Sequence, residues 1–269
     1  MKWVPPGPAF LFCPGDRPER FAKAAAASDV VILDLEDGVA PENREAAREH
    51  VRSATLNPAT TIVRVNPVGS LEHARDLEML RASPYSMFML AKASSAQEIL
   101  SLEPFSIIAL CETPRGVVAA DEMAGCANTL GLMWGAEDLV AGLGGYSSRR
   151  DDTSYRDVAR YARSRVLVAA GANDRCALDA VYLNFQDLEG QRAEALDAAA
   201  MGFSATVCIH PSQVAVVRGA YRPTPEQLAW ATKILELAKD HDGVFRLDGF
   251  MVDGPVVAQA RQIVSRSNT

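Results

Sequence analysis

Short apolar runs that end in charged residues constrain the fold of this chain more than any other feature. Such runs are typical of buried parallel strands, and polar groups at one end only indicate a site built on the carboxyl edge of the sheet. The runs and the polar residues after them are 30–33 before Asp34, Glu36 and Asp37, 61–63 before Arg64, 87–90 before Lys92, 107–110 before Glu112, 130–134 before Glu137 and Asp138, and 207–209 before His210. The pattern therefore predicts both a parallel sheet and an active site.

Eight strands alternating with helices predict a closed (β/α)8 TIM barrel of the α/β class. The expected strands are 9–14, 29–35, 61–66, 87–92, 106–112, 129–135, 179–183 and 206–210. The main alternative, an open doubly wound sheet, normally carries a glycine-rich phosphate loop after its first strand, and residues 14–18 read PGDRP instead.

Helical periodicity fills the segments between the strands. Helices are expected at 41–54, with Pro41 in the first turn, at 155–171, and at 187–201, where Gly202 ends the helix. The expected buried faces are Tyr155, Val158, Ala159, Ala162, Val166 and Ala169 in the second of these helices, and Leu188, Ala195, Leu196 and Ala199 in the third.

The chain continues past the barrel, so we divide it into a catalytic domain, residues 1–220, and a C-terminal helical extension, residues 221–269. Thr224 to Gln227 form a capping box that begins a helix ending near residue 239, and a turn around Asp253 precedes a last helix. The extension is expected to serve as packing, a lid or an oligomer contact. The irregular segment 142–152 is expected to lie over the catalytic face.

Composition narrows the function classes. A chain of 269 residues with 48% hydrophobic residues can bury a large core, and the net charge of -7 argues against a nucleic-acid surface. No apolar run is long enough to span a membrane, and the N-terminus predicts no signal peptide. Five scattered cysteines without a pairing pattern favour reduced core residues and a cytoplasmic location.

Glu112 and Asp138 are the candidate metal ligands. Adjacent barrel strands lie about 4.8 Å apart, so two inward carboxylates at their ends can share one cation. Two carboxylates with positions left for water and substrate suit Mg²⁺. The alternative hypothesis is that both acids cap helix N-termini or pair with Arg115 or Arg64.

Arg64 is the candidate anion clamp, because a guanidinium holds a carboxylate in a bidentate manner. Its alternative role is a structural ion pair with Glu36 or Asp37. Asp34, Glu36 and Asp37 cannot all be buried and unpaired, so one is expected to share a metal-bound water or to pair with Lys92 or Arg64. His210 is favoured as a hydrogen-bonded barrel residue over a base.

Six motifs in chain order resemble the citrate lyase β-subunit-like proteins, in the superfamily of malyl-CoA lyases and class II HpcH/HpaI aldolases. The combination of the motifs is specific, whereas each alone is weak. They are FCPGDRPERF at 12–21, ILDLEDGV at 32–39, RVN at 64–66, ETPRG at 112–116, GAEDL at 135–139 and CIHP at 208–211.

The resemblance implies a Mg²⁺-dependent barrel, usually a homotrimer, that acts on a carbon–carbon bond beside a CoA thioester. Residues 251–255, MVDGP, resemble a tail motif whose aspartate reaches a neighbouring subunit, so Asp253 is expected to act in trans as acid or base. By the same resemblance, Glu112 and Asp138 bind metal, Asp253, Arg64 and Asp37 are catalytic, and Arg64, Glu112, Gly135, Ala136, Glu137, Glu36 and Lys92 line the substrate.

The implied reaction is cleavage or formation of a 3-hydroxyacyl-CoA, such as citramalyl-CoA or malyl-CoA, through a thioester enolate. The partners would be a 2-oxoacid and an acyl-CoA, with neither nucleic acid nor membrane. The alternatives are a citrate lyase β subunit, a CoA-independent pyruvate aldolase, a malate-synthase-like condensation or thioester hydrolysis, and a non-enzymatic regulatory barrel. Acyl groups that differ by one methylene are separated by only ~1–3 kcal/mol, so the sequence leaves the acyl group open.

Overall fold

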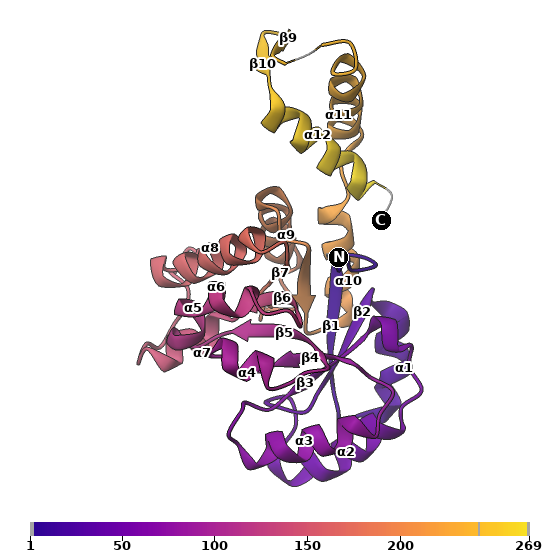
Figure 1. Ribbon diagram of the computed structural model, residues 1–269, viewed down its shortest axis with the longest axis vertical. Helices are drawn as coiled ribbons and strands as arrows, with labels where there is room; N and C mark the ends of the chain where they lie inside the picture. Colours follow the sequence, from indigo (N-terminus) through magenta and orange to yellow (C-terminus); the bar gives the residue numbers. More distant parts are fainter. Residues whose placement is uncertain (1–2, 242, 268–269) are drawn as a thin grey trace. The chain divides into compact units, whose positions relative to one another are not determined.

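Eight parallel strands close into a barrel in sequence order, and β1 pairs with both β2 and β8 (Figure 1). The computed structural model describes residues 3–241 and 243–267. The strands are β1 (Ala9–Pro14), β2 (Val30–Asp34), β3 (Thr61–Val65), β4 (Met87–Leu90), β5 (Ser106–Cys111), β6 (Thr129–Trp134), β7 (Cys176–Asp179) and β8 (Ala205–Cys208). The predicted (β/α)8 barrel is confirmed.

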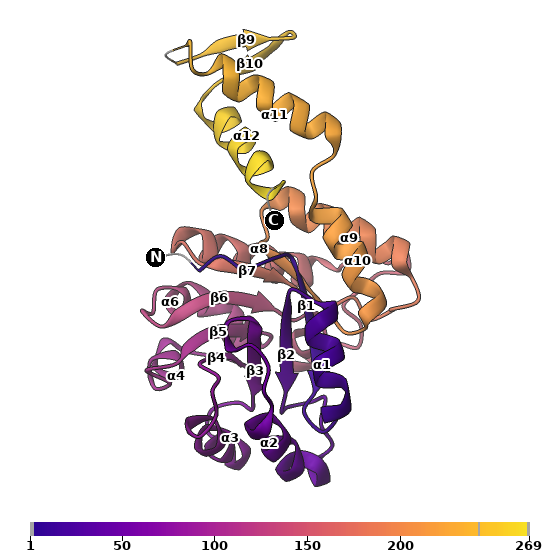
Figure 2. The same ribbon diagram turned by 90° about the vertical axis from the view of Figure 1, so that its right-hand side faces the viewer.

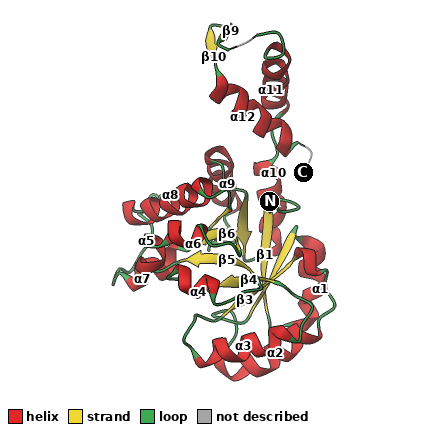
Figure 3. Cartoon of the chain, in the orientation of Figure 1, coloured by secondary structure: helices red, strands yellow, loops and turns green. Residues whose placement is uncertain are grey.

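Helices surround the strands on the outside of the barrel (Figure 3). Short polar residues begin several of them; for example, the Thr113 side chain accepts a hydrogen bond from Gly116 N at the start of α5. The helices are α1 (Pro18–Ala27), α2 (Arg44–Ser53), α3 (Leu71–Arg81), α4 (Ala96–Leu100), α5 (Pro114–Val118), α6 (Ala120–Ala124), α7 (Ala136–Gly142), α8 (Asp157–Ala172), α9 (Leu188–Met201) and α10 (Pro211–Tyr221), with 3-10 turns at Pro41–Asn43 and Pro58–Thr60.

The seventh strand lies earlier in the sequence than the predicted segment 179–183. It spans Cys176–Asp179, and its pairing with β6 begins where Cys176 lies opposite Gly131. Gly131 permits this approach, because a Cβ atom there would lie 2.8 Å from the Cys176 carbonyl oxygen. Asp179 ends the strand, where its carboxylate accepts hydrogen bonds from the Trp134 indole and from Arg163. The apolar residues after Asp179 were therefore wrongly assigned to the strand.

Two predicted helix faces need correction. Val158 of α8, and Leu188 and Leu196 of α9, are exposed rather than buried. The buried face of α9 consists of Gln191, Ala195, Ala198 and Ala199. Small side chains on this face let α9 pack closely on the barrel, whereas both leucines are exposed. The predicted end of α9 is confirmed, because Gly202 adopts a left-handed conformation with φ of 110°.

Inward-facing apolar side chains fill the barrel. Side chains alternate between the two faces of a strand, so the residue two positions after an inward core residue also points inward. Ile32, Ile62 and Leu110 belong to the core, and Asp34, Arg64 and Glu112 follow them by two residues. The core residues are Phe10, Val30, Ile32, Ile62, Met87, Met89, Ile108, Leu110, Met133, Leu178, Ala205 and Val207.

The chain forms two compact units, residues 1–217 and residues 218–269. In the second unit α11 (Pro225–Leu237) and α12 (Gly254–Arg266) lie side by side, joined through the hairpin of β9 (Phe245–Leu247) and β10 (Phe250–Val252) (Figure 2). The predicted capping box is confirmed, since the Thr224 side chain accepts from Gln227 N and the Gln227 side chain accepts from Thr224 N. The core of this unit contains Ala231, Ile234, Phe245, Val252 and Ala260.

All five cysteines are buried, in agreement with their expected role as core residues. Within residues 3–241 and 243–267, none of the helices combines the length and the apolar character that a membrane crossing requires.

Candidate active site

Arg64 projects from the carboxyl end of β3 into a group of carboxylates. Its Nε and Nη2 atoms donate to the two oxygens of Asp34 at 2.7 and 2.6 Å, and Nη1 lies 3.2 Å from Glu36 Oε2. The guanidinium carbon lies 4.7 Å from the centroid of the Phe12 ring. Of its predicted partners, Arg64 contacts Glu36, whereas Asp37 pairs with Lys92 instead.

Arg64 keeps its positive charge although it is buried. Burial alone would lower its pKa, but the carboxylates of Asp34, Glu36 and Glu112 raise the pKa above the ordinary arginine value. A guanidinium has five N–H bonds, and the contacts with Asp34 and Glu36 use three of them. Among the described residues no acceptor contacts the other two, so structural pairing and binding of a substrate carboxylate are compatible roles for this residue.

Lys92 connects the acidic residues of three loops. Its ammonium contacts Glu36 and lies 3.1 Å from Asp37 Oδ2 and 3.4 Å from Asp138 Oδ1, while its main-chain N–H donates to Glu112 Oε1 at 3.0 Å. Its backbone has φ of 52°, a strained conformation for a non-glycine residue. This conformation follows β4 and directs both the main-chain donor and the ammonium toward the acids.

Glu112 follows β5 and has only 4% of its surface exposed. Burial, together with the nearby negative charge of Asp138, raises the pKa of its carboxyl to about 8, against the opposing effect of Arg64 and Lys92. Among the described residues, no hydrogen bond reaches its second carboxylate oxygen. A buried carboxylate of this kind is a suitable ligand for a hard divalent cation.

Asp138 lies in the first turn of α7, not at the end of strand six as predicted. Its side chain is 39% exposed, and its charge acts on Glu112. The described part of the chain contains no group of three or more His, Cys, Asp or Glu side chains placed to hold a metal ion. The carboxylates of Glu112 and Asp138 would suit a cation that takes two protein carboxylates and completes its shell with water and substrate, as Mg²⁺ does.

The turn between β6 and α7 lies directly against Glu112. A Cβ atom at Gly135 would lie 2.7 Å from the Glu112 Cβ and 3.0 Å from its Oε2. Ala136 begins α7, so the chain is helical rather than extended at Glu137. The Glu137 carboxylate turns toward segment 142–152, where it accepts a hydrogen bond from Ser148 Oγ at 2.6 Å. The Glu137 carboxylate is thus directed to Ser148 rather than to the group around Glu112.

Gly135→Ala should weaken Mg²⁺ binding by displacing Glu112. The backbone of Gly135, with φ of -129°, permits alanine, so the effect is steric, and overpacking of this kind costs about 1–3 kcal/mol of stability. Gly171→Ala in α8 is the control, because a methyl group there meets open space. Thermal unfolding and Mg²⁺ titration measure the two effects, and unchanged Mg²⁺ affinity in Gly135→Ala would contradict the role of this turn.

The expected pairing of one of Asp34, Glu36 and Asp37 with Arg64 or Lys92 is confirmed, and Asp34 makes the shortest contacts to Arg64. The strand register places Asp34 opposite Arg64 in the pairing of β2 with β3. A second network was missed: Asp76 of α3 accepts from Arg48 Nε at 2.8 Å and from the main-chain and side-chain nitrogens of Asn66 at 2.9 and 2.8 Å. Both sets of contacts join segments that are distant in the sequence, so their exact partners depend on the strand register and on helix packing.

Two further residues of the sequence analysis, His210 and Asp253, make contacts outside the group around Arg64 and Glu112. His210 is exposed, its Nδ1 atom lies 2.8 Å from Ser212 Oγ, and its ring stacks on Phe185 with centroids 4.9 Å apart. Asp253 lies in the second unit as the N-cap of α12, where its side chain accepts from Val256 N at 3.4 Å. Its neighbours Phe250 and Met251 are exposed.

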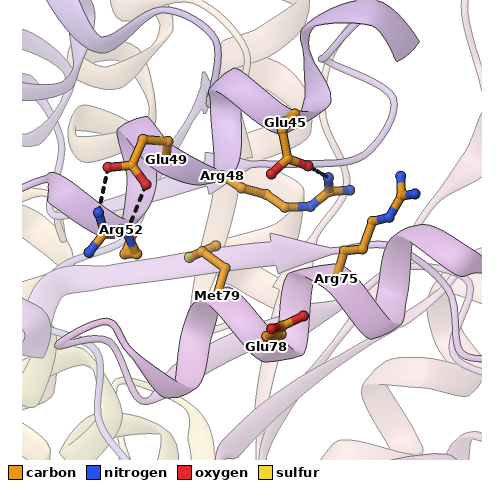
Figure 4. Close-up of a pocket in the computed structure, with 7 residues that line it drawn as sticks. All are labelled: Glu45, Arg48, Glu49, Arg52, Arg75, Glu78 and Met79. Carbon is orange, nitrogen blue, oxygen red and sulfur yellow. Dashed lines mark hydrogen bonds and ion pairs between the residues drawn. The ribbon is translucent and has the colours of Figure 1, made fainter.

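Two clefts lie away from this group of residues. One of about 380 Å³ lies between α2 and α3, and its charges largely pair with each other, as in Arg48 with Glu45 and Arg52 with Glu49 (Figure 4). The other, of about 500 Å³, is an apolar groove within the second unit. Its lining residues are Trp230, Ile234, Leu247, Asp248, Phe250, Met251, Val252, Val256 and Gln259.

Comparison with known proteins gives consistent matches. The HpcH/HpaI aldolase/citrate lyase family matches residues 9–211. The chain is 56% identical over 261 residues to the citrate lyase subunit beta-like protein of Mycobacterium tuberculosis, covering 97% of this chain and 96% of that protein. It is 33% identical over 301 residues to the mitochondrial citramalyl-CoA lyase of Rattus norvegicus, covering 98% and 86%.

A solved structure extends the likeness to three dimensions. The crystal structure of protein CitE from Mycobacterium tuberculosis, in complex with magnesium, acetoacetate and coenzyme A, matches with a TM-score of 0.95 and 56% identity. The match covers 98% of both chains, so it includes the residues of the second unit as well as the barrel.

Proposed function

The chain belongs to the HpcH/HpaI aldolase/citrate lyase family, and from that premise we propose that it cleaves or forms the carbon–carbon bond of a 3-hydroxyacyl-CoA such as citramalyl-CoA or malyl-CoA. It is a carbon–carbon lyase that works with Mg²⁺. The observation that carries the proposal is the grouping of Arg64, with two N–H bonds available, beside the carboxylates of Glu112 and Asp138.

In the cleavage direction the C3 hydroxyl gives its proton to a general base, the role we assign to the Asp253 carboxylate, and the bond between C2 and C3 breaks. The bond electrons remain on the thioester as an enolate, which takes up a proton at C2 to give the acyl-CoA, and C3 becomes the carbonyl of the 2-oxoacid. Glu112 and Asp138 would hold Mg²⁺, which supplies Lewis-acid stabilisation of the developing negative charge on oxygen. Arg64 binds the carboxylate of the 2-oxoacid half and so orients the C2–C3 bond.

The other polar residues hold this arrangement in place. Burial would raise the pKa of Asp37, but the hydrogen bond from Lys92 lowers it below the ordinary aspartate value, so Asp37 stays ionised. Glu36 and Asp37 can then accept hydrogen bonds from ordered water beside the metal ligands, and Lys92 offsets part of their charge. The main chain of Gly135 and Ala136 is expected to line the 2-oxoacid, with Glu137 supplying backbone only.

We assign Asp253 as the acid that protonates the enolate, delivered from a neighbouring subunit of a homotrimer. The exposed Phe250 and Met251 beside Asp253, and the apolar groove next to them, support contact between the second unit and another chain. Residues 1–220 would then form the catalytic domain and 221–269 the extension that contacts the neighbour. The five buried cysteines, which have no disulfide pairing pattern in the sequence, support a cytoplasmic location.

The likeness to a citrate lyase subunit beta-like protein favours a second candidate function, which is cleavage of a citryl thioester to give oxaloacetate. The two candidates differ in their thioester substrate, not in the chemistry at Arg64 and Glu112. The family also includes aldolases, so a CoA-independent pyruvate aldolase is the third candidate.

Oxoacid release separates the candidates. The purified protein is incubated with citramalyl-CoA, malyl-CoA, citryl-CoA or the corresponding CoA-free hydroxyacids, with Mg²⁺ and again with excess chelator, and pyruvate, glyoxylate or oxaloacetate is measured. Metal-dependent pyruvate or glyoxylate release supports the lyase and ranks the acyl groups. Release only from citryl-CoA favours the citrate lyase candidate, and turnover of CoA-free hydroxyacids alone contradicts the proposal. Simultaneous thiol detection distinguishes thioester hydrolysis.

Mg²⁺ affinity should rise with pH up to about pH 8. The metal-free protein holds a proton on Glu112 below its pKa of about 8, and this proton must leave before both carboxylate oxygens can serve as ligands. The apparent affinity should therefore increase roughly tenfold per pH unit below that pKa and level off above it. Calorimetry in buffers of different ionisation enthalpy measures the proton released, and a flat profile between pH 6 and 9 contradicts the metal assignment.

A further inference from the structure

We propose that Asp34 is the positioning residue for Arg64, holding the guanidinium so that its two remaining N–H bonds face the carboxylate of the 2-oxoacid. The inference rests on the proposed function of this site. Asp34 is the last residue of β2, only 3% exposed, and lies opposite Arg64 in the register of β2 with β3. Its side chain points into the barrel, two residues beyond the core residue Ile32.

Both oxygens of Asp34 are occupied by donors. Oδ1 accepts from Arg64 Nε at 2.7 Å and from Glu36 N at 3.0 Å. Oδ2 accepts from Arg64 Nη2 at 2.6 Å and from Gly38 N at 2.9 Å. A carboxylate with two donors on each oxygen has little capacity left to bind a cation or a substrate hydroxyl. Asp34 must therefore act through Arg64 and through the Glu36–Gly38 turn.

Gly38 shows how closely this turn is built around Asp34. A Cβ atom at position 38 would lie 2.2 Å from Asp34 Oδ2, so only glycine lets the main-chain N–H reach the carboxylate. One carboxylate thus fixes two things together: the orientation of Arg64 and the turn that carries Glu36 and Asp37. Asp34 therefore positions both the basic Arg64 and the acidic turn of the site.

Without the Asp34 carboxylate, Arg64 has two other acids to bind. Glu36 already lies 3.2 Å from Nη1, and the charge of Glu112 acts on the same guanidinium. A guanidinium that turns toward these acids no longer presents its free edge to a substrate. The loss should therefore fall on 2-oxoacid binding, while the Mg²⁺ ligands and the acyl-CoA half of the site are affected much less.

Asp34→Asn is the direct test, with pyruvate binding in saturating Mg²⁺ measured by calorimetry. Asparagine keeps the shape but places an amide where donors converge, so pyruvate should bind about ten- to a hundredfold more weakly. Mg²⁺ affinity should change by less than about threefold. Asp179→Asn is the matched control, because Asp179 is also a buried aspartate at a strand end with two bonds from one arginine, Arg163. The control should leave pyruvate affinity unchanged.

A double-mutant cycle with Arg64→Lys tests whether Asp34 acts through Arg64. If it does, adding Asp34→Asn to Arg64→Lys should lower pyruvate affinity by less than about threefold more. If the two residues act independently, the fold losses of the two single variants should multiply. Should Asp34→Asn fail to fold, Gly38→Ala displaces the same carboxylate and should give the same selective loss. Normal pyruvate affinity in either folded variant overturns this inference alone. A wild-type protein that binds no 2-oxoacid overturns the proposed function instead.

Discussion

Replacing Glu112 with glutamine should lower Mg²⁺-dependent turnover by at least about 10²–10³-fold, the range expected for losing a major electrostatic stabiliser. Glutamine matches the shape of Glu112 but lacks the charge that would hold the cation. Because the Glu112 carboxyl is buried and has a raised pKa, its neutral replacement should leave the fold intact and should not reduce the thermal unfolding temperature. Steady-state kinetics at several Mg²⁺ concentrations measure the loss.

The dependence of the rate on Mg²⁺ concentration distinguishes loss of a metal ligand from loss of a residue that only shapes the site. A lost ligand should raise the Mg²⁺ concentration needed for half-maximal rate as well as lower the maximum. Glu45→Gln, on the exposed face of α2, is the charge-matched control. A near-normal rate for Glu112→Gln at limiting Mg²⁺ would show that the metal assignment is wrong.

Asp253→Asn should lower turnover by about 10²–10⁴-fold, the contribution typical of a positioned general acid. Asparagine caps a helix as well as aspartate does, so α12 should stay intact and the loss should reflect the proton alone. Mg²⁺ and pyruvate affinity should be unchanged, because neither ligand needs this acid. A loss of activity that is accompanied by a lower thermal unfolding temperature would instead assign Asp253 a purely structural role as the cap.

Mixed oligomers test delivery in trans. Subunits carrying Asp253→Asn and subunits carrying Glu112→Gln are each inactive, but a neighbouring pair can combine one intact barrel with one intact aspartate. Random mixing should then restore about a quarter of wild-type turnover in a closed ring of identical interfaces. No recovery on mixing, with exchange of subunits shown independently, would place Asp253 in its own subunit's site or outside any site.

Much of this protein is predictable from local pattern. Apolar runs of strand length at regular spacing predict the eight-stranded barrel, because each strand must be buried on both faces. The polar residues that end these runs must meet at one edge, so the sequence predicts that Arg64, Lys92 and Glu112 lie together, as they do in the structure. The capping box at Thr224 and the helix end at Gly202 were also predicted, because both signals lie within one turn of the chain.

Other features depend on which residues meet across the barrel. The seventh strand was placed too late, because apolar character alone does not show where Gly131 permits close approach of Cys176. Asp138 was expected at a strand end but belongs to the first turn of a helix, and it still reaches Lys92. A sequence shows that carboxylates are present, but the local conformation decides which way each one points.

Asp34 is the clearest example of the difference between what the sequence predicts and what the tertiary structure decides. The sequence by itself determined the barrel, the edge on which the polar residues gather and their chemical types, because those follow from continuous apolar runs of strand length and from the polar residues that end them. Only the tertiary structure decided that Asp34, rather than Glu36 or Asp37, takes the bidentate contact with Arg64. That choice depends on the register between β2 and β3, which is set by packing between segments 30 residues apart.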